Sequence, residues 1–254
     1  MPEPAADSGP LPACARPWGF WITIAWTLLI GAGYVVAQGV VLIIYTGPGS
    51  LRSDRPPTLE ALISDGDLLA WCTICSAPVG VGLCVLFAWL RKGIRVRDYL
   101  GWCRPGGRAW LRWCGAIILF GAASDLVTTL VLKQPLVPEV MVDIYRNAGN
   151  LPLLWLAIVV AGPVAEEFMF RGFLFAGLQG ADRSRWRDLA AVTATSGTWA
   201  GIHLQYDAYG MAVIFLGGIL LGYARVRTGS LPLCILLHGL MNLVATVEVT
   251  LMLA

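Results

Sequence analysis

Long apolar segments, separated by short groups of charged residues, run through the whole of this chain. The first is the longest, because no Asp, Glu, Lys or Arg occurs between Pro17 and Leu51. A helix needs about 20 apolar residues to cross a bilayer. We expect about seven such spans, near 18–46, 67–91, 110–132, 151–178, 188–207, 207–225 and 227–248. Long apolar runs satisfy their backbone groups in lipid by forming helices. The sequence therefore predicts an all-α, polytopic transmembrane helix bundle.

Composition agrees with this fold class and excludes a soluble globular domain. Hydrophobic residues make up 57% of the chain and charged residues 13%, with a mean hydropathy of +0.69, whereas soluble domains carry about 25% charged residues. The net charge of +2 predicts no nucleic-acid partner. The segment "CTIC" (72–75) has the spacing of a redox CxxC motif, but no βαβ pattern surrounds it. The seven cysteines therefore indicate neither a redox site nor a disulfide framework.

The charges also predict how the domain is oriented. Residues 1–17 are expected to be a disordered tail, and residues 18–254 a single transmembrane domain. Cytoplasmic loops carry an excess of Lys and Arg. With a cytoplasmic N-terminus, thirteen of the 18 basic residues lie on the cytoplasmic side and four on the other, while Arg171 lies within a span. We therefore expect a multi-pass protein of a bacterial inner membrane with its C-terminus outside, and a short interfacial helix within 134–150.

A few polar side chains lie inside the predicted spans, where such groups usually face the bundle interior and mark function. They are Asp125, Glu166, Glu167, Arg171, His203, His238 and Asn242. They predict a polar intramembrane cavity. Three of them lie in "AGPVAEEFMFRGFLF" (161–175). Glu167 and Arg171 are four residues apart, so they share a helix face and can pair, whereas Glu166 points about 140° away from Arg171. We predict that the pair fixes the helix and that Glu166 faces the cavity and transfers protons.

The two histidines complete the set of groups that hydrolysis would need. His203 follows Trp199 by four residues, and His238 and Asn242 are also four apart, so each pair shares a helix face. A carboxylate with an imidazole can accept and pass a proton and polarise a water. A His with an Asn can stabilise negative charge on a carbonyl oxygen. At about 1.5 Å per residue His203 and His238 lie at different depths, so the spans must tilt, or their ends differ, for these groups to meet.

Three motifs in this order resemble those of a known family. "EEFMFR" (166–171) matches EExxxR, "WAGIH" (199–203) matches FxxxH with Trp in place of Phe, and "HGLMN" (238–242) matches HxxxN. Over residues 150 to 245 the chain is similar to the CPBP family of intramembrane glutamic endopeptidases. The best-known members of that family are the type II CAAX prenyl proteases. Nothing in the sequence indicates prenyl recognition, and some family members are proposed to act as immunity proteins or scaffolds.

The resemblance implies a role for each matched residue. Glu166, assisted by His203, would activate water, and His238 with Asn242 would form the oxyanion site. Glu167 and Arg171 would support this geometry. The expected function is metal-independent hydrolysis of a peptide bond in a membrane-associated peptide or protein, without a cofactor.

Three alternatives remain open from the sequence. The first is a zinc-dependent membrane protease, in which Glu166, His203 and His238 are ligands, although no HExxH motif is present. The second is a non-catalytic membrane immunity or adaptor protein of the same fold. The third is a transporter with a proton relay through Asp125, Glu167 and His203, although no inverted repeat is visible. For Asp125, a structural hydrogen bond to a neighbouring helix is the simpler interpretation.

Overall fold

The computed structural model describes residues 16–47, 57–181 and 184–254, and all regular structure in these residues is helical. Most of the predicted tail 1–17 lies outside the described residues, as do Arg52, Arg55 and Arg183 of the charge count. Six helices are long and apolar enough to cross a membrane: Phe20–Thr46, Gly66–Leu90, Ala109–Val131, Leu151–Gln179, Ala208–Thr228 and Leu231–Leu253. The predicted polytopic helix bundle is confirmed.

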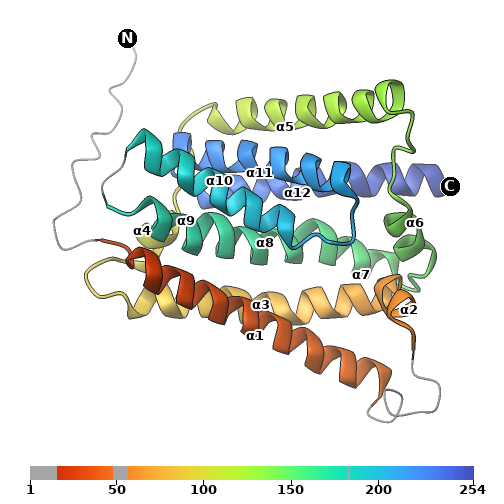
Figure 1. The fold of residues 1–254 in the computed structure, drawn as a ribbon, viewed down its shortest axis with the longest axis horizontal. Coiled ribbons are helices and arrows are strands. Elements are labelled where there is room, and N and C mark those ends of the chain that lie inside the picture. The colour runs from red at the N-terminus through yellow and green to blue at the C-terminus, as the bar shows by residue number, and fades with distance from the viewer. Residues whose placement is uncertain (1–15, 48–56, 182–183) are drawn as a thin grey trace.

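Figure 1 shows these helices packed side by side along the long axis of the molecule. The elements of the first half are α1 (Phe20–Thr46), α2 (Leu59–Ile63), α3 (Gly66–Leu90), α4 (Val96–Leu100), α5 (Ala109–Leu126), the π-helix η2 (Val127–Val131) and α6 (Glu139–Arg146). A central helical segment follows, made of α7 (Leu151–Trp155), η3 (Leu156–Ala161), α8 (Gly162–Glu167), η4 (Phe168–Leu174) and α9 (Phe175–Gln179). The chain ends with α10 (Arg185–Gly201), α11 (Ala208–Thr228) and α12 (Leu231–Leu253). Helix α6 is the short helix expected within 134–150.

Helix α10 corresponds to the short fifth span expected at 188–207. It has 17 residues and is not among the six long apolar helices. It begins at the Ser184 cap, whose hydroxyl accepts from the backbone N–H of Arg187, and it packs against α11 and α9. It ends at Gly201, so residues 202–207 form a connection that leads to the Asp207 cap of α11. The predicted span therefore exists as a helix, but His203 lies beyond its end.

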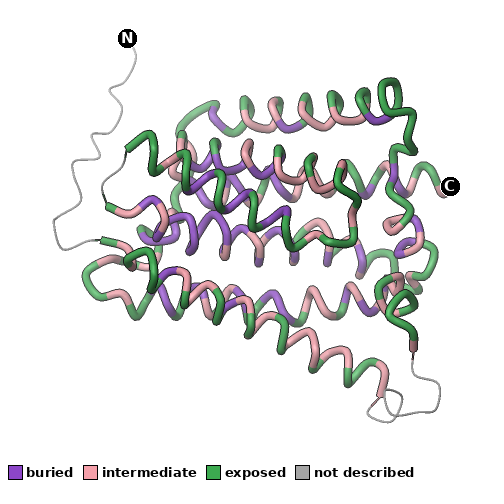
Figure 2. The backbone as a smooth tube through the Cα atoms, viewed as in Figure 1, coloured by how far each residue is buried: buried purple, intermediate pink, exposed green. Residues whose placement is uncertain are grey.

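The central segment 151–179 is the most buried of the six long helices. Its neighbours include α1, α3, α10 and α12, and Figure 2 shows its backbone as the longest buried stretch of the fold. Large apolar side chains, including Phe170, Phe173 and Phe175, fill the space around it. The segment is interrupted by two π-helices. Such bulges shift the phase of a helix and are frequent at functional sites, and this pair flanks the two glutamates.

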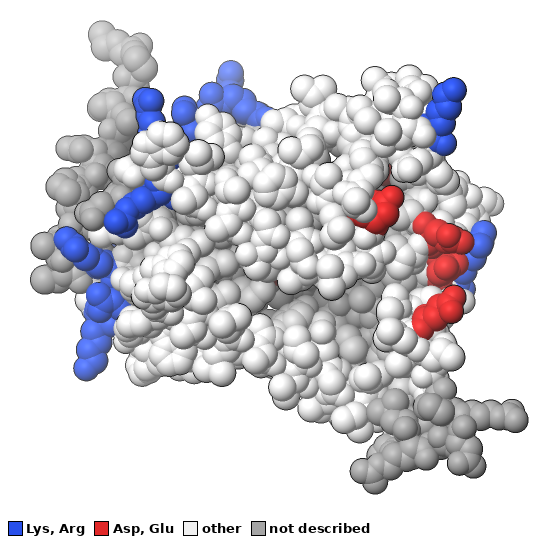
Figure 3. All heavy atoms as spheres, in the orientation of Figure 1, with Lys and Arg blue, Asp and Glu red and all other residues white. Residues whose placement is uncertain are grey.

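Charged side chains gather at the two ends of the bundle. Figure 3 shows most of the visible Lys and Arg near the beginnings of α1 and α10, and the visible Asp and Glu toward the opposite end. The broad middle of the visible face carries almost no charge. This distribution is the one that the predicted alternation of spans requires.

Candidate active site

The structure confirms the predicted pair of Glu167 and Arg171. Their side chains are fully buried, and Arg171 Nη1 lies 2.7 Å from Glu167 Oε1. A buried ion pair needs further partners to offset the loss of hydration. Arg171 Nη2 donates to the carbonyl of Gly218 at 3.2 Å, and its guanidinium carbon lies 4.7 Å from the ring centroid of Trp199. The pair therefore joins the central segment to α10 and α11.

Close packing of α11 allows this arrangement. A Cβ at Gly218 would lie 2.9 Å from the Cβ of Ser196 and 3.0 Å from the Trp199 ring. A larger residue would push α10 away from the carbonyl that Arg171 binds. Small residues let membrane helices approach closely, and Gly218 of "FLGGILLGYA" (215–224) does so at the site itself.

His238 lies between the two glutamates. Its Nδ1 is 3.0 Å from Glu167 Oε1, and its Nε2 is 4.0 Å from Glu166 Oε2. A carboxylate only accepts hydrogen bonds. Nδ1 therefore carries a hydrogen atom and donates a hydrogen bond to Glu167. This fixes the ring and leaves Nε2 on the side of Glu166, as a carboxylate does for the histidine of a catalytic triad.

Glu166 differs from its neighbour because it faces a cavity. Its side chain is 25% exposed whereas that of Glu167 is 0% exposed. It lines a cavity of about 70 Å³ together with Tyr34, Met169 and Ile202, which is large enough to hold water. Its Oε2 accepts a hydrogen bond of 2.6 Å from the indole Nε1 of Trp199. The predicted separation between a compensated Glu167 and a cavity-facing Glu166 is present in the geometry.

Asn242 lies one turn after His238 on α12 and binds the central segment. Its Nδ2 donates to the carbonyl oxygen of Ile158 at 2.8 Å. In the π-helix η3, Gly162 donates to Ala157, five residues back. With the same spacing, the carbonyl oxygen of Ile158 would accept from the backbone N–H of residue 163. That residue is a proline, which has no N–H. One amide hydrogen of Asn242 therefore replaces a missing backbone donor, and the other remains for a ligand.

His203 lies farther from Glu166 than the sequence suggested. Its Nδ1 is 2.7 Å from the carbonyl oxygen of Trp199, and among the described residues no hydrogen bond or ion pair joins it to Glu166. The Trp199 ring contacts both imidazoles, with centroids 5.5 Å from His203 and 5.0 Å from His238. Because α10 ends at Gly201, Trp199 reaches the level of the glutamates and His203 follows in the connection. Ile202, its neighbour in sequence, lines the cavity.

Three aromatic residues near Glu166 were not predicted as site residues. Trp199 is its hydrogen-bond donor, and Tyr34 of α1 lines the cavity. Burial, and to a smaller extent the charge of Glu166, raises the pKa of Tyr206 to about 12, so its phenol stays protonated at neutral pH. The spacing of four residues before His203 was a signal for Trp199. The two tyrosines belong to no motif and reach the site only through the tertiary fold.

The other polar residues bear on the alternatives. Within the described parts of the chain, no three His, Cys, Asp or Glu side chains are grouped so that they could hold a metal ion. Asp125 shares a side-chain hydrogen bond with Glu248 of α12, as the structural interpretation of this residue expects.

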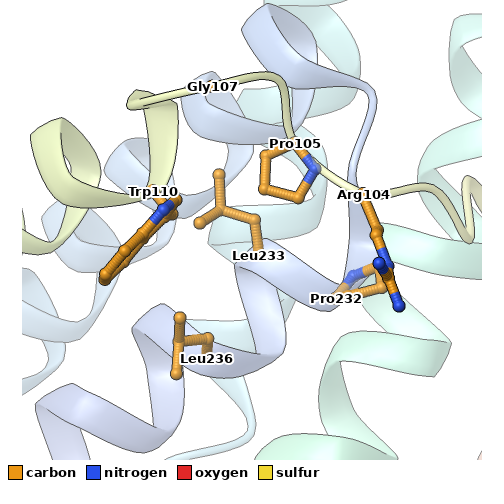
Figure 4. Close-up of a pocket in the computed structure, with 7 residues that line it drawn as sticks. All are labelled: Arg104, Pro105, Gly107, Trp110, Pro232, Leu233 and Leu236. Carbon is orange, nitrogen blue, oxygen red and sulfur yellow. The ribbon is translucent and has the colours of Figure 1, made fainter.

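A larger cavity lies elsewhere and is not the candidate active site. It has a volume of about 360 Å³ and lies between the 101–108 loop and the first turns of α5 and α12. Figure 4 shows Arg104, Pro105, Trp110 and Leu233 around it. No carboxylate or imidazole lines it, so it offers no general base.

Fold and site together define a helical membrane protein in which a glutamate faces a small cavity beside a buried Glu–Arg–His cluster. Residues 148–244 match the family model described as type II CAAX prenyl endopeptidase Rce1-like. The matched segment contains all three motifs. It agrees with the resemblance that they indicate: residues 148–244 are similar to a CAAX-protease-like membrane domain.

One curated relative matches most of the chain. It is a protein of Escherichia coli described as an uncharacterized 24.3 kDa protein, 27% identical over 215 residues, which cover 84% of this chain and 87% of the relative. No solved structure matches the chain significantly. The match to the relative extends beyond the segment that carries the motifs.

Proposed function

We propose that this protein is a metal-independent intramembrane glutamic endopeptidase, which hydrolyses a peptide bond of a membrane-associated peptide or protein. One observation carries the proposal: of the two adjacent glutamates, Glu167 is compensated by Arg171 and His238, whereas Glu166 faces a cavity large enough for water. A purely structural ion network gives Glu166 no reason to face that cavity.

In this proposal Glu166 and His203 activate the water. The cavity lies between Glu166 and the connection that carries His203. As the water oxygen attacks the carbonyl carbon of the substrate, Glu166 accepts its proton. The proton then passes to the amide nitrogen, the C–N bond breaks, and a carboxylic acid and an amine leave. Such proton transfer contributes about 10²–10⁴-fold to a rate.

His238 and Asn242 would stabilise the charge that develops on the carbonyl oxygen. Nε2 of His238 faces the Glu166 side and donates when the ring carries both protons, one of which Glu167 holds at Nδ1. Asn242 has one amide hydrogen left after its bond to Ile158. Donors that are fixed before the reaction are effective because they need no reorganisation as the charge develops.

The substrate is expected to approach from within the membrane. The walls of the cavity come from α1, α3 and α8, which lie in predicted spans, and from the connection after α10. A volume of about 70 Å³ holds water but no peptide, so the walls of the cavity would move apart for a substrate to enter. The basic end of the bundle would face the cytoplasm of a bacterial inner membrane, with the N-terminus on that side.

The test is a comparison of membrane peptides in cells that carry the wild type or Glu166→Gln. Uncleaved substrate should accumulate in the variant and should be cleaved by the purified wild type after prolonged incubation in EDTA. Glu248→Gln is the matched control. It makes the same chemical change in another helix, at a carboxylate whose partner is Asp125 and not a residue of the candidate active site. If no membrane peptide changes while Glu166→Gln keeps the cellular phenotype, the protein is a non-catalytic immunity or adaptor protein.

A further inference from the structure

Trp199 contacts four residues of the candidate site: Glu166, Arg171, His203 and His238. Its indole Nε1 donates to Glu166 Oε2 at 2.6 Å, and its ring lies beside the Arg171 guanidinium and the His238 imidazole. The side chain is only 3% exposed. The matching position of the family motif is Phe, which can pack in the same place but has no hydrogen to donate. Trp199 therefore supplies a hydrogen-bond donor that the phenylalanine of the motif lacks.

We propose that Trp199 is a positioning residue for the general base, a role that rests on the proposed function of Glu166. The indole N–H fixes Oε2 and leaves Oε1 of the carboxylate for the water. Short hydrogen bonds to an ionised acceptor are strong and favour the charged form over the protonated acid. Trp199 thereby keeps Glu166 ready to accept a proton inside an apolar bundle.

The surroundings of the ring hold this donor in place. The guanidinium of Arg171 lies over one face of the indole, and Gly218 leaves space for its edge. The backbone carbonyl of Trp199 accepts a hydrogen bond of 2.7 Å from Nδ1 of His203. A donor enclosed in this way cannot turn away from Glu166 without moving α10.

The experiment measures the protonation of Glu166 directly and needs no substrate. Dicyclohexylcarbodiimide modifies protonated carboxyl groups in apolar surroundings, and peptide mass spectrometry reports modification of Glu166 at each pH. In Trp199→Phe, the modified fraction of Glu166 should increase, because the carboxylate loses its hydrogen-bond donor. Trp186→Phe is the matched control, since Trp186 is an exposed residue of the same helix.

A second variant keeps the shape of the side chain. Benzothienylalanine at position 199 replaces the indole N–H by sulfur and should shift the modification profile as Trp199→Phe does, with an unchanged melting temperature. An unchanged profile in both variants overturns the proposal, even if Glu166→Gln abolishes cleavage. A shifted profile in a protein that cleaves nothing supports the contact and refutes the proposed function instead.

The larger cavity carries a separate inference. Arg104 is exposed at its edge, and among the described residues it has no hydrogen bond or ion pair. Figure 4 shows Arg104 and Trp110 on opposite sides of Leu233, with Leu236 nearby. Trp110 and Leu236 are exposed as well. A single cation therefore lies beside an apolar floor, at the end of the bundle where basic side chains gather.

The geometry points to one anionic phospholipid as the occupant. Its phosphate would bind Arg104, and an acyl chain would lie along Trp110, Leu233 and Leu236. Charge complementarity supports this choice, because Arg104 is the basic residue that lines the cavity, Arg108 follows in the same loop, and basic side chains near the membrane surface attract anionic lipid headgroups. The aromatic ring at this level is typical of the membrane interface.

Fluorescence quenching in vesicles tests this site. The protein is placed in equal mixtures of phosphatidylglycerol and phosphatidylcholine, with bromine on the acyl chains of one lipid or the other. The Trp110 signal is the difference between wild type and Trp110→Phe. Brominated phosphatidylglycerol should quench it more strongly, and Arg104→Gln should abolish that preference. Equal quenching by both lipids overturns the inference, as does loss of the preference when inorganic phosphate is added.

Discussion

The side-chain amide of Asn242 donates to the carbonyl oxygen of Ile158 at 2.8 Å, which joins α12 to the π-helix η3. The acceptor lacks an intrahelical donor because Pro163 occupies the position that would supply it. A residue of the HxxxN motif thus has a structural partner as well as its proposed catalytic role. The two roles can be separated by changing the proline.

The first prediction concerns this contact. Asn242→Ala should lower the free energy of unfolding by about 1 kcal/mol, because it leaves a partly buried carbonyl without a donor. Pro163→Ala restores a backbone N–H and should offset part of that loss in the double variant. Unfolding of the purified protein in detergent measures the three variants. Strictly additive effects of the two substitutions would show that the proline does not create the need for Asn242.

The second prediction concerns the buried ion pair. Arg171→Met should destabilise the protein by about 3–5 kcal/mol, because it leaves the carboxylate of Glu167 buried without its cation. Glu167→Gln combined with Arg171→Met removes the stranded charge, so the double variant should be more stable than Arg171→Met alone. The same unfolding assay compares them. A double variant no more stable than Arg171→Met would mean that the charge of Glu167 is not what destabilises the single variant.

The sequence predicts those features of the site that depend on local geometry. The pairing of Glu167 with Arg171 follows from a spacing of four residues, and it survives the start of a π-helix at Phe168. The spans follow from length and hydropathy. The position of His203 could not be predicted, because it depends on α10 ending at Gly201. The hydrogen bond from Trp199 to Glu166 was not predictable either. The two residues are 33 positions apart in the sequence and lie on different helices.

The third prediction tests the close approach of α11. Gly218→Ala should cost about 1–3 kcal/mol of stability, since its Cβ would lie 2.9 Å from Ser196 and 3.0 Å from the Trp199 ring. Gly121→Ala is the control, because a Cβ there meets nothing within 4 Å. Thermal unfolding should separate the two variants. Equal melting temperatures would show that α10 and α11 can move apart at no cost.

The fourth prediction concerns alkaline pH. The pKa of Tyr206 is raised to about 12 from an ordinary value of 10.0, so between these values the unfolded chain loses the phenolic proton and the folded protein keeps it. Stability must therefore fall as the pH rises through this window. Tyr206→Phe should remove its share of the fall and leave stability near neutral pH almost unchanged. Identical slopes above pH 10.0 in wild type and variant would contradict the raised pKa.

The fifth prediction separates the two histidines. The imidazole of His203 contacts Trp199 and lies in an accessible connection, so His203→Ala should keep the melting temperature of the wild type. If it assists Glu166, its loss should slow cleavage of the peptide found by comparative proteomics by about 10²-fold or more. His238→Ala should lower both rate and stability, because it removes the donor to the buried carboxylate of Glu167. Full activity of His203→Ala would remove that residue from the mechanism and leave His238 as the imidazole nearest to Glu166.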